Sequence, residues 1–327
     1  MSAPLVHAEK LSRSFRVRQG FFAGKAEMMA VCDVDLAIGR GEAVGVVGES
    51  GCGKTTLGRM LLRLLAPTQG RVIFDGQDLN QLERLDLRRL RRRMQMIFQD
   101  PFASLDPRRP AGGQIADGIL IHDLSDRSDV ADRVAELLKR VGLDHSHASR
   151  LPHEFSGGQR QRIAIARALA TRPDFVVADE PVSSLDVSVQ AQVLNLLADL
   201  RAEFGLALLF ISHDLHVVRH ICERVVVMYL GCVVEEGKAA DVFRAPAHPY
   251  TRALIAATPS IRPEARRNKI VLSGEPPSAI KRPSGCVFRT RCAYATTTCS
   301  ETVPTLSRFG EGRSVACLRA AEIAANK

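Results

Sequence analysis

Short apolar runs alternate along the first 245 residues with longer segments in which apolar residues recur at helical spacing. The runs at 43–48 (AVGVVG), 175–178 (FVVA) and 206–213 (LALLFISH) predict buried strands. Residues 55–65 and 187–204 fit amphipathic helices, and Pro67 and Gly70 end the first of them. Strands that alternate with helices predict an α/β fold with a largely parallel sheet.

Two regions interrupt this alternation. Residues 111–172 look mainly helical, with loops near 122–127 and 144–155, and predict an inserted helical subdomain at about 100–172. Past residue 245 prolines cluster and the periodicity fades, which indicates a separate extension. We therefore expect one domain over 1–245 and a C-terminal extension over 246–327.

Charge and hydropathy narrow the possible classes. The 327 residues include 45 basic and 36 acidic ones, for a net charge of +9. Such a charge fits a protein that binds a nucleic acid, an anionic membrane or a nucleotide, and it also fits a protein with only a solvated basic surface. The basic run RRLRRR (88–93), which we expect to be helical, could touch lipid head groups or membrane subunits, or could be a solvated helix face. The longest apolar run, 225–234, is about half the roughly 20 residues that a membrane helix needs. With no signal-peptide core at the N-terminus, we expect a cytoplasmic protein with reduced thiols.

The stretch GESGCGKT at 48–55 fits the phosphate-binding pattern G-x-x-x-x-G-K-[ST], and it lies between a predicted strand and a predicted helix. Its glycines let successive backbone N–H groups face one anion, and the start of the helix adds a positive dipole. Lys54 is expected to reach the β- and γ-phosphates and Thr55 to bind Mg²⁺. The full set expected to contact ATP here is Gly48, Ser50, Gly51, Cys52, Gly53, Lys54, Thr55 and Thr56, with Cys52 only a small loop residue.

Downstream polar residues follow the predicted strands. Asp179 and Glu180 end FVVADE, so that Asp179 would bind Mg²⁺ and Glu180 would act as general base toward water. His213 follows the next buried strand and could sense a γ-phosphate. Gln99 in IFQDP could bind Mg²⁺ or the attacking water. We accordingly expect Lys54, Gln99, Glu180 and His213 to form the catalytic set.

A second glycine cluster, FSGGQ at 155–159, looks like another phosphate cradle. Ser156 can cap the following helix and bond a phosphate oxygen, and Gly157 and Gly158 let the helix N-terminus approach an anion. The alternative is a plain helix cap. Nothing in this motif alone says why one chain would carry two such cradles.

Taken in order, GESGCGKTT, Gln99, FSGGQ, FVVADE, SSLD (183–186) and His213 resemble the motifs of the ATP-binding-cassette (ABC) ATPases over about residues 5–245. The resemblance implies a P-loop NTPase (RecA-like) core, an N-terminal antiparallel β subdomain and an inserted helical subdomain. It also implies a head-to-tail pair of ATPase chains, in which the second cradle of one chain completes the ATP site of the other.

Further roles come from the same resemblance. Ser156, Gly157 and Gly158 would contact ATP in the partner's site, and Gln159 would support their loop. Asp186 and its neighbours would cross the dimer interface, and the loop of Gln99 would link the nucleotide site to membrane subunits. Phe15 in SRSFRV is the candidate for stacking on adenine.

More narrowly, the chain resembles the ATPases of dipeptide, oligopeptide and nickel importers, through FQDPFASLDPR (98–108), AHPYTRAL (247–254) and SGEPPS (273–278). This implies a peripheral protein on the cytoplasmic face of the inner membrane, which hydrolyses ATP to drive import. Its partners would be a second ATPase, different or identical, two membrane permeases and an extracytoplasmic peptide-binding protein, with no nucleic acid. Nickel or another solute is an alternative cargo, and a soluble ABC ATPase acting on nucleic acid or ribosomes is the alternative class.

Four cysteines, Cys286, Cys292, Cys299 and Cys317, fall within the extension. Thiolates in a segment with little apolar core suit a metal that holds it together, and the absence of C-x2-C spacing favours a [4Fe–4S] cluster over Zn²⁺. Free thiols are the alternative.

Overall fold

The computed structural model describes residues 3–18, 24–257 and 274–325. It divides the chain into two compact units, one formed by residues 1–5, 38–43 and 74–211 and the other by residues 6–37, 44–73 and 212–327. Each unit combines segments that are distant in sequence. Among the described residues, no helix has both the length and the apolar character needed to cross a bilayer.

The first unit contains three parallel strands and the helices α2 to α7. Strand β7 (Phe175–Asp179) pairs with β6 (Met94–Ile97) on one side and with β8 (Ala207–Ile211) on the other. All five residues of β7 and of β8 are buried, which explains why these strands are apolar at every position rather than alternating. The predicted buried strands at 175–178 and 206–213 are therefore confirmed.

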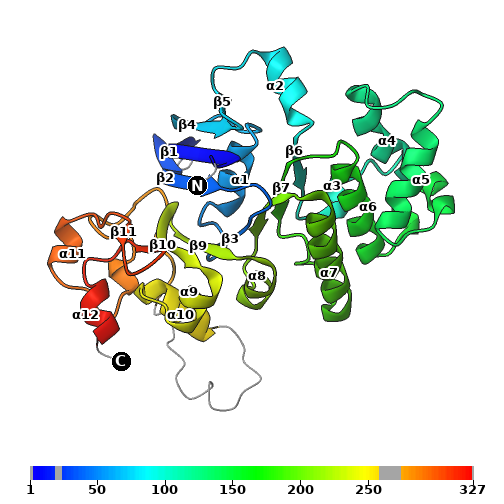
Figure 1. Ribbon diagram of the computed structural model, residues 1–327. Helices are drawn as coiled ribbons and strands as arrows, with labels where there is room; N and C mark the ends of the chain where they lie inside the picture. The colour runs from blue at the N-terminus through cyan, green and yellow to red at the C-terminus, as the bar shows by residue number, and fades with distance from the viewer. Residues whose placement is uncertain (1–2, 19–23, 258–273, 326–327) are drawn as a thin grey trace. The chain divides into compact units, whose positions relative to one another are not determined.

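The helices of this unit follow the predicted pattern. Helices α4 (Ala111–Ile121), α5 (Val130–Arg140) and α6 (Gly157–Leu169) pack together beside α7 (Val187–Phe204), with short 3₁₀ turns at His145–Ser149 and Pro152–Glu154 (Figure 1). The expected loops near 122–127 and 144–155 lie between them. Shorter elements complete the unit, namely β5 (Gln77–Asp78), α2 (Arg84–Arg91) and α3 (Pro101–Ser104).

The second unit contains a β subdomain and a mixed sheet. Strands β1 (Val6–Arg18), β2 (Lys25–Ile38) and β4 (Gln69–Phe74) lie in the order β2-β1-β4 and form the expected antiparallel subdomain. Strand β3 (Ala43–Val47) runs parallel to β9 (Arg224–Tyr229), which pairs antiparallel with β10 (Cys232–Lys238). Helix α1 (Lys54–Leu61) follows β3, and α8 (Leu215–Ile221) precedes β9.

The C-terminal extension is built into this second unit. Its strand β12 (Arg313–Val315) pairs antiparallel with β10 and with β11 (Ser307–Arg308). Helix α9 (Ala239–Arg244) precedes the extension, whose own helices are α10 (Pro249–Ala257), α11 (Thr298–Glu301) and α12 (Ala320–Ala325), with a 3₁₀ turn at Arg289–Arg291. Tyr229, Tyr250 and Phe288 pack ring against ring, with centroids 4.7–5.4 Å apart. This aromatic cluster joins the extension to β9, so the extension shares a core with the sheet.

Candidate functional site

The phosphate-binding loop lies between β3 and α1, as the sequence predicts, and Gly53 caps the helix with φ of +103°. A Cβ placed on Gly53 would lie 2.1 Å from the Ala30 carbonyl oxygen, and one on Gly48 would lie 2.2 Å from the Met228 carbonyl oxygen. Both positions therefore require glycine, because backbone atoms of β2 and β9 occupy the space of a side chain. The curl of the loop is fixed by its neighbours.

Lys54 is buried within this loop, with 5% of the residue exposed. Its Nζ donates to the carbonyl oxygens of Gly48 at 2.8 Å and Glu49 at 3.0 Å. The ammonium group is thus held over the loop by carbonyl oxygens that an anion would replace. Thr55 and Thr56 follow in the first turn of α1, partly exposed.

Ser50, Gly51 and Cys52 complete the loop. Ser50 is exposed, and Gly51 has open space around the position of a Cβ. Cys52 is buried, and burial raises the pKa of its thiol. Burial therefore favours the neutral thiol at this position.

The extension contacts the phosphate-binding loop through Glu49, a relationship that the sequence analysis missed. Arg291 donates to both carboxylate oxygens of Glu49, at 2.8 and 3.1 Å, and the Glu49 backbone N–H donates to the Tyr250 hydroxyl at 2.8 Å. Tyr250 is fully buried, and burial raises its pKa, so it acts as a neutral hydroxyl. In the sequence, Tyr250 lies within AHPYTRAL (247–254) and Arg291 within GCVFRTRC (285–292), and neither run indicates a contact with Glu49.

Phe15 lies in β1, partly exposed. The guanidinium of Arg13 lies 4.7 Å from the centre of its ring, which is a cation–π contact. One face of the ring is therefore covered by a cation.

The predicted carboxylates lie at the end of β7. Asp179 is 2% exposed, and Glu180 has a left-handed backbone with φ of +44°. This φ is rare for a residue other than glycine, and it is held by a hydrogen bond from the Glu180 N–H to the Ile211 carbonyl at 2.9 Å. Gln99, which follows β6, donates through Nε2 to Glu180 Oε2 at 3.3 Å. The structure thus brings together two of the four predicted catalytic side chains.

The other two predicted catalytic side chains belong to the second unit. Lys54 lies in the phosphate-binding loop, and His213 is an exposed residue that follows β8. The roles predicted for these four residues stay predictions.

The second glycine cluster forms a capped helix N-terminus. The Gln159 N–H donates to Ser156 Oγ at 3.3 Å, and the Ser156 N–H donates to Gln159 Oε1 at 3.0 Å, which is a capping box at the start of α6. A Cβ on Gly157 would lie 3.4 Å from the Leu185 side chain. The cluster therefore lies against the SSLD loop, whose Asp186 is the N-cap position of α7 and makes no side-chain cap bond.

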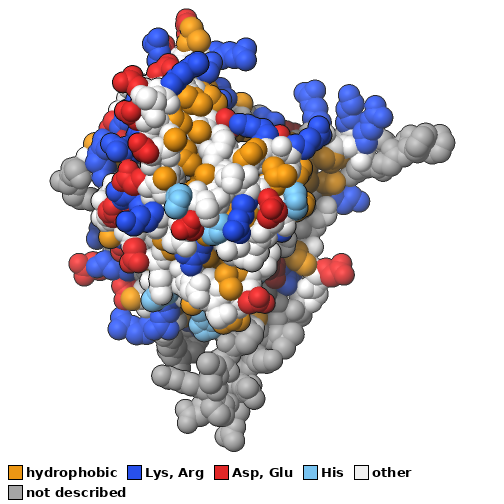
Figure 2. Space-filling model, turned by 90° about the vertical axis from the view of Figure 1, so that its right-hand side faces the viewer, with side chains coloured by type: hydrophobic (Ala, Val, Ile, Leu, Met, Phe, Trp, Pro, Cys, Tyr) orange, Lys and Arg blue, Asp and Glu red, His pale blue; other side chains and the backbone are white. Residues whose placement is uncertain are grey.

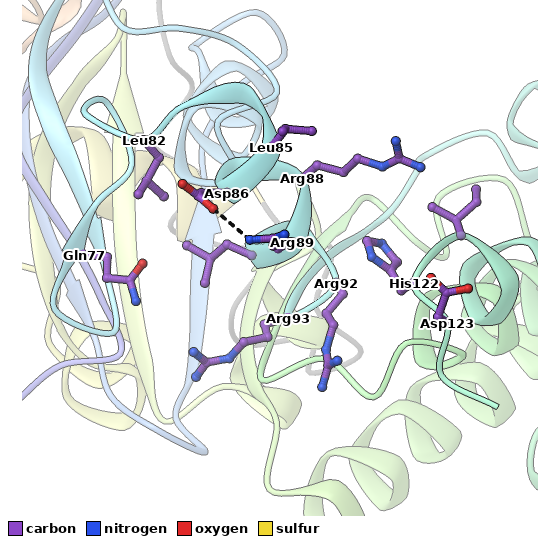
Figure 3. A pocket seen from close by; sticks show the side chains of 12 residues that line it. Gln77, Leu82, Leu85, Asp86, Arg88, Arg89, Arg92, Arg93, His122 and Asp123 are labelled. Carbon is purple, nitrogen blue, oxygen red and sulfur yellow. Dashed lines mark hydrogen bonds and ion pairs between the residues drawn. The ribbon is translucent and has the colours of Figure 1, made fainter.

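The basic run lies on and just after α2 and lines an open groove of about 860 Å³ (Figure 3). Arg88 and Arg92 flank it on the α2 side, and His122 and Asp123 flank it at the end of α4. Burial, followed by the charges of Arg88 and Arg92, lowers the pKa of His122, which keeps the imidazole neutral beside the arginines. In Figure 2, exposed hydrophobic side chains lie among charged ones on one face of the molecule.

The four tail cysteines line one small cavity, together with His248 and Phe288. All four are free thiols, and burial raises the pKa of Cys286, of Cys317 and of Cys292, the last to about 11. The cavity measures about 20 Å³, close to the space of a single water. In the described part of the chain, no group of three or more His, Cys, Asp or Glu side chains is arranged to hold a metal ion. The expected metal centre is therefore not supported by this arrangement.

Comparison with known proteins gives two family matches in this chain. The family described as ABC transporter matches residues 31–183, and the one described as oligopeptide/dipeptide transporter, C-terminal region, matches residues 234–299. The first contains the phosphate-binding loop, the second glycine cluster and the carboxylates. The second contains Tyr250 and Arg291.

Relatives match over nearly the whole chain. A Brucella ovis protein named as a peptide import ATP-binding protein is 50% identical over 97% of this chain and 98% of its own length. The oligopeptide transport ATP-binding protein AppF of Bacillus subtilis is 47% identical over 96% of both chains. A solved structure, the dimeric ATP-binding cassette MJ0796 in a post-hydrolysis state with ADP and Pi, matches with a TM-score of 0.64 and 30% identity, over 72% of this chain and 98% of that one.

Proposed function

The chain belongs to the ABC transporter family and is an ATPase of that family, and from this premise we propose that it powers the import of di- or oligopeptides, or of a related small solute, across the cytoplasmic membrane. The match of residues 234–299 to the oligopeptide/dipeptide transporter C-terminal region carries the proposal. The names of the relatives support a peptide cargo over nickel. A soluble ATPase acting on nucleic acid has no comparable support.

We propose that the phosphate-binding loop holds the β- and γ-phosphates through its backbone N–H groups and Lys54. The ammonium already lies against the carbonyl oxygens of Gly48 and Glu49, so it needs only a small displacement to meet a phosphate. The hydroxyl of Thr55 and the buried carboxylate of Asp179 are oxygen donors of the type that Mg²⁺ prefers, and Gln99 could add an amide oxygen. When bound, Mg²⁺ would neutralise charge that develops on the transferred phosphate.

Glu180 is the proposed general base. Its strained backbone lies at the end of β7, and its carboxylate, which accepts a hydrogen bond from Gln99, would accept a proton from water. His213 would contact the γ-phosphate, and Thr56 would assist beside Thr55. Withdrawal of Gln99 would release Glu180, which would couple movement of the Gln99 loop to hydrolysis.

We propose that a second ATPase subunit, a related but different chain, meets the face that carries Ser156–Gly158 and Asp186. Gln159 holds the Ser156 loop through the capping box, so the N-terminus of α6 is preorganised to receive a phosphate of the partner's ATP. A homodimer would use the same face. Phe15 would stack on adenine through the ring face that Arg13 leaves uncovered.

The proposed membrane partners are two permeases, which place this subunit at the cytoplasmic face and receive peptide from an extracytoplasmic binding protein. The groove lined by Arg88, Arg92 and His122 is the proposed contact for an acidic cytoplasmic loop of a permease. Replacement of Arg88 and Arg92 by glutamate should release the permeases from the complex while ATP binding persists. Retention of the permeases would assign the basic run to a solvated face.

For the tail cysteines we propose a soft metal, a [4Fe–4S] cluster or Zn²⁺, which requires the side chains to rearrange. The residue types fit, but the present cavity holds no more than about one water, and thiols must lose their protons to bind a metal. Protein purified without oxygen should contain stoichiometric iron or zinc that is lost in a Cys292→Ser variant. Folded, metal-free protein would overturn this proposal.

The central test is the Glu180→Gln variant. We expect it to bind ATP with unchanged affinity, to lose at least about 100-fold in kcat and to form a stable ATP-bound dimer. Glu301→Gln, at an exposed glutamate of the extension, is the control and should leave all three unchanged. Normal turnover in Glu180→Gln would overturn the assignment of the base.

Recovery of two permeases and a peptide-binding protein with this chain from solubilised membranes would test the transport proposal separately.

A further inference from the structure

Two cysteines from distant parts of the chain meet next to the phosphate-binding loop. Cys32 lies in β2, and Cys232 is the first residue of β10. The Cys32 N–H donates to the Gly231 carbonyl at 2.9 Å, and the two side chains share a hydrogen bond. Both are free, half-buried thiols. The backbone thus holds the two partly exposed thiols close together.

A guanidinium group from the C-terminal extension completes this cluster. Arg282 Nη2 donates to Cys232 Sγ at 2.8 Å, and the same side chain hydrogen-bonds the Cys32 thiol. Arg282 Nε is buried and has no hydrogen-bond partner within the described residues. The negative charge of Asp33, next to Cys32, opposes the effect of Arg282 on the Cys32 thiol. Its carboxylate, however, lies 3.7 Å from the Lys10 ammonium, which partly neutralises it. The cation therefore acts mainly on the two sulfurs.

The thiol pair ionises as a unit. The hydrogen bond from Cys232, assisted by Arg282, lowers the pKa of Cys32, and the same hydrogen bond together with burial raises the pKa of Cys232. The pair thus holds one thiolate and one thiol near neutral pH. A thiolate next to a second thiol is the arrangement in which oxidation to a disulfide is fast and reversible.

We propose that Cys32 and Cys232 form a redox site that reacts with hydroperoxides. The thiolate attacks one peroxide oxygen, the O–O bond breaks and hydroxide leaves, which gives a sulfenic acid. The second sulfur then attacks the first, the S–O bond breaks, and the departing hydroxide takes the thiol proton as water. With protonation of the first hydroxide, two sulfurs lose two electrons to one hydrogen peroxide, and two waters form.

The redox site adjoins the backbone that shapes the phosphate-binding loop. A Cβ on Gly53 or on Gly231 would lie 2.1 or 2.8 Å from the same atom, the Ala30 carbonyl oxygen, and the Gly231 N–H donates to the Cys52 carbonyl at 2.9 Å. A disulfide of about 2.05 Å between the two sulfurs would tie β2 to β10 at this point. Oxidation is therefore expected to weaken ATP binding, and reduction to restore it.

Peptide mass mapping of the reduced full chain, exposed to equimolar hydrogen peroxide, tests the site. We expect a Cys32–Cys232 cross-link that has lost two hydrogens and that dithiothreitol reverses, formed before oxidation of the buried Cys222. In an Arg282→Met variant the cross-link should form about tenfold more slowly at pH 6, because loss of the cation raises the pKa of Cys32 toward that of an ordinary thiol, about 8.5, and leaves less thiolate there. Arg282→Lys, which keeps the cation, should stay near the rate of the unchanged protein.

Two results would overturn the redox site. One is oxidation of the tail cysteines while Cys32 and Cys232 remain unmodified, and the other is an equal rate in the Arg282→Met variant. Equilibrium binding then tests the link to the loop, with an expected increase of about fivefold in the Kd for ATP after oxidation. A Cys32→Ser variant treated with peroxide is the control and should bind ATP unchanged. A cross-linked protein with the Kd of reduced protein would separate the redox site from the phosphate-binding loop.

Discussion

Arg291 and Glu49 are 242 residues apart, and the guanidinium of one donates two hydrogen bonds to the carboxylate of the other. The Arg291 side chain is 5% exposed and that of Glu49 is 25% exposed, so solvent screens the pair only in part. Arg291 also lies next to Tyr229, whose hydroxyl is 3.5 Å from Nη1. The hydrogen bonds of Glu49 raise the pKa of Arg291 further, which keeps it charged at any pH at which the protein is folded.

An Arg291→Ala variant is expected to loosen the phosphate-binding loop. Loss of charged hydrogen bonds at a largely buried position should lower the free energy of unfolding by about 2 kcal/mol, and the KM for ATP should rise about tenfold while kcat changes less. Urea unfolding and steady-state kinetics measure the two effects. Arg289→Ala, which removes a neighbouring arginine bonded to Ser284, is the matched control.

A double-mutant cycle with Glu49→Gln separates this contact from general damage to the extension. A coupling of about 1–3 kcal/mol between Glu49→Gln and Arg291→Ala would support the positioning role. Additive effects of the two substitutions would contradict it, because each would then act through different partners.

Gly53→Ala is expected to destabilise the second unit more than an ordinary glycine substitution. The backbone φ of +103° and the Ala30 carbonyl oxygen 2.1 Å from the new Cβ act together, so we expect a loss of about 3 kcal/mol. Gly76→Ala is the matched control, since its φ is +78° and its Cβ would meet open space, which leaves a strain of about 1 kcal/mol. Urea unfolding without nucleotide measures both, and equal losses would show that the loop yields to Ala30.

Much of the fold follows from local pattern. The helix expected over 187–204 is α7 with the same bounds, and the buried strand at 175–178 is β7, because continuous burial selects continuous apolar runs. The phosphate-binding loop could also be predicted, because its glycine spacing is a local pattern, although the backbone atoms that require Gly48 and Gly53 belong to β9 and β2. The order of these motifs along the chain then indicated the family.

The relationships that the sequence did not reveal are all long-range. Glu49 meets Arg291, and Cys32 meets Cys232 and Arg282, through strands and loops that local periodicity cannot pair. The tail cysteines show a different limit of prediction, because these residues are close in sequence. Their clustering in sequence predicted a metal centre, yet the cavity that they line measures only about 20 Å³, and burial raises the pKa of Cys286, Cys292 and Cys317.

Ser156 can be tested by substitutions that separate helix capping from phosphate contact. Ser156→Ala should cost about 1 kcal/mol of unfolding free energy through loss of the cap on α6. Ser156→Asp should keep the cap, and hence the stability, but should weaken ATP-dependent dimerisation because a carboxylate would face phosphate. Light scattering with ATP in the Glu180→Gln background measures dimerisation. Full dimerisation of Ser156→Asp would show that this side chain does not approach the partner's nucleotide.

The Asp75–Arg93 pair predicts the acid sensitivity of the first unit. Arg93 donates through Nη2 to Asp75 at 2.7 Å and through Nε to Asp174 at 2.6 Å. The hydrogen bond from Arg93 lowers the pKa of Asp75 below its unfolded value of about 3.9. The unfolded chain therefore binds the proton first, so the stabilisation is complete above about pH 4 and is lost as the pH falls through the lower folded pKa.

An Asp75→Asn variant should remove this pH dependence. Asparagine tolerates the left-handed backbone of this position, φ +49°, so the substitution tests the charge alone. Because the pair is about one-third exposed, we expect a loss of only about 0.5–1 kcal/mol at pH 7 and a smaller difference from the unchanged protein at pH 3. Urea unfolding at the two pH values measures this, with Asp126→Asn, at an exposed carboxylate, as the control. A difference that stays constant between pH 7 and pH 3 would show that Asp75 acts through packing rather than through its charge.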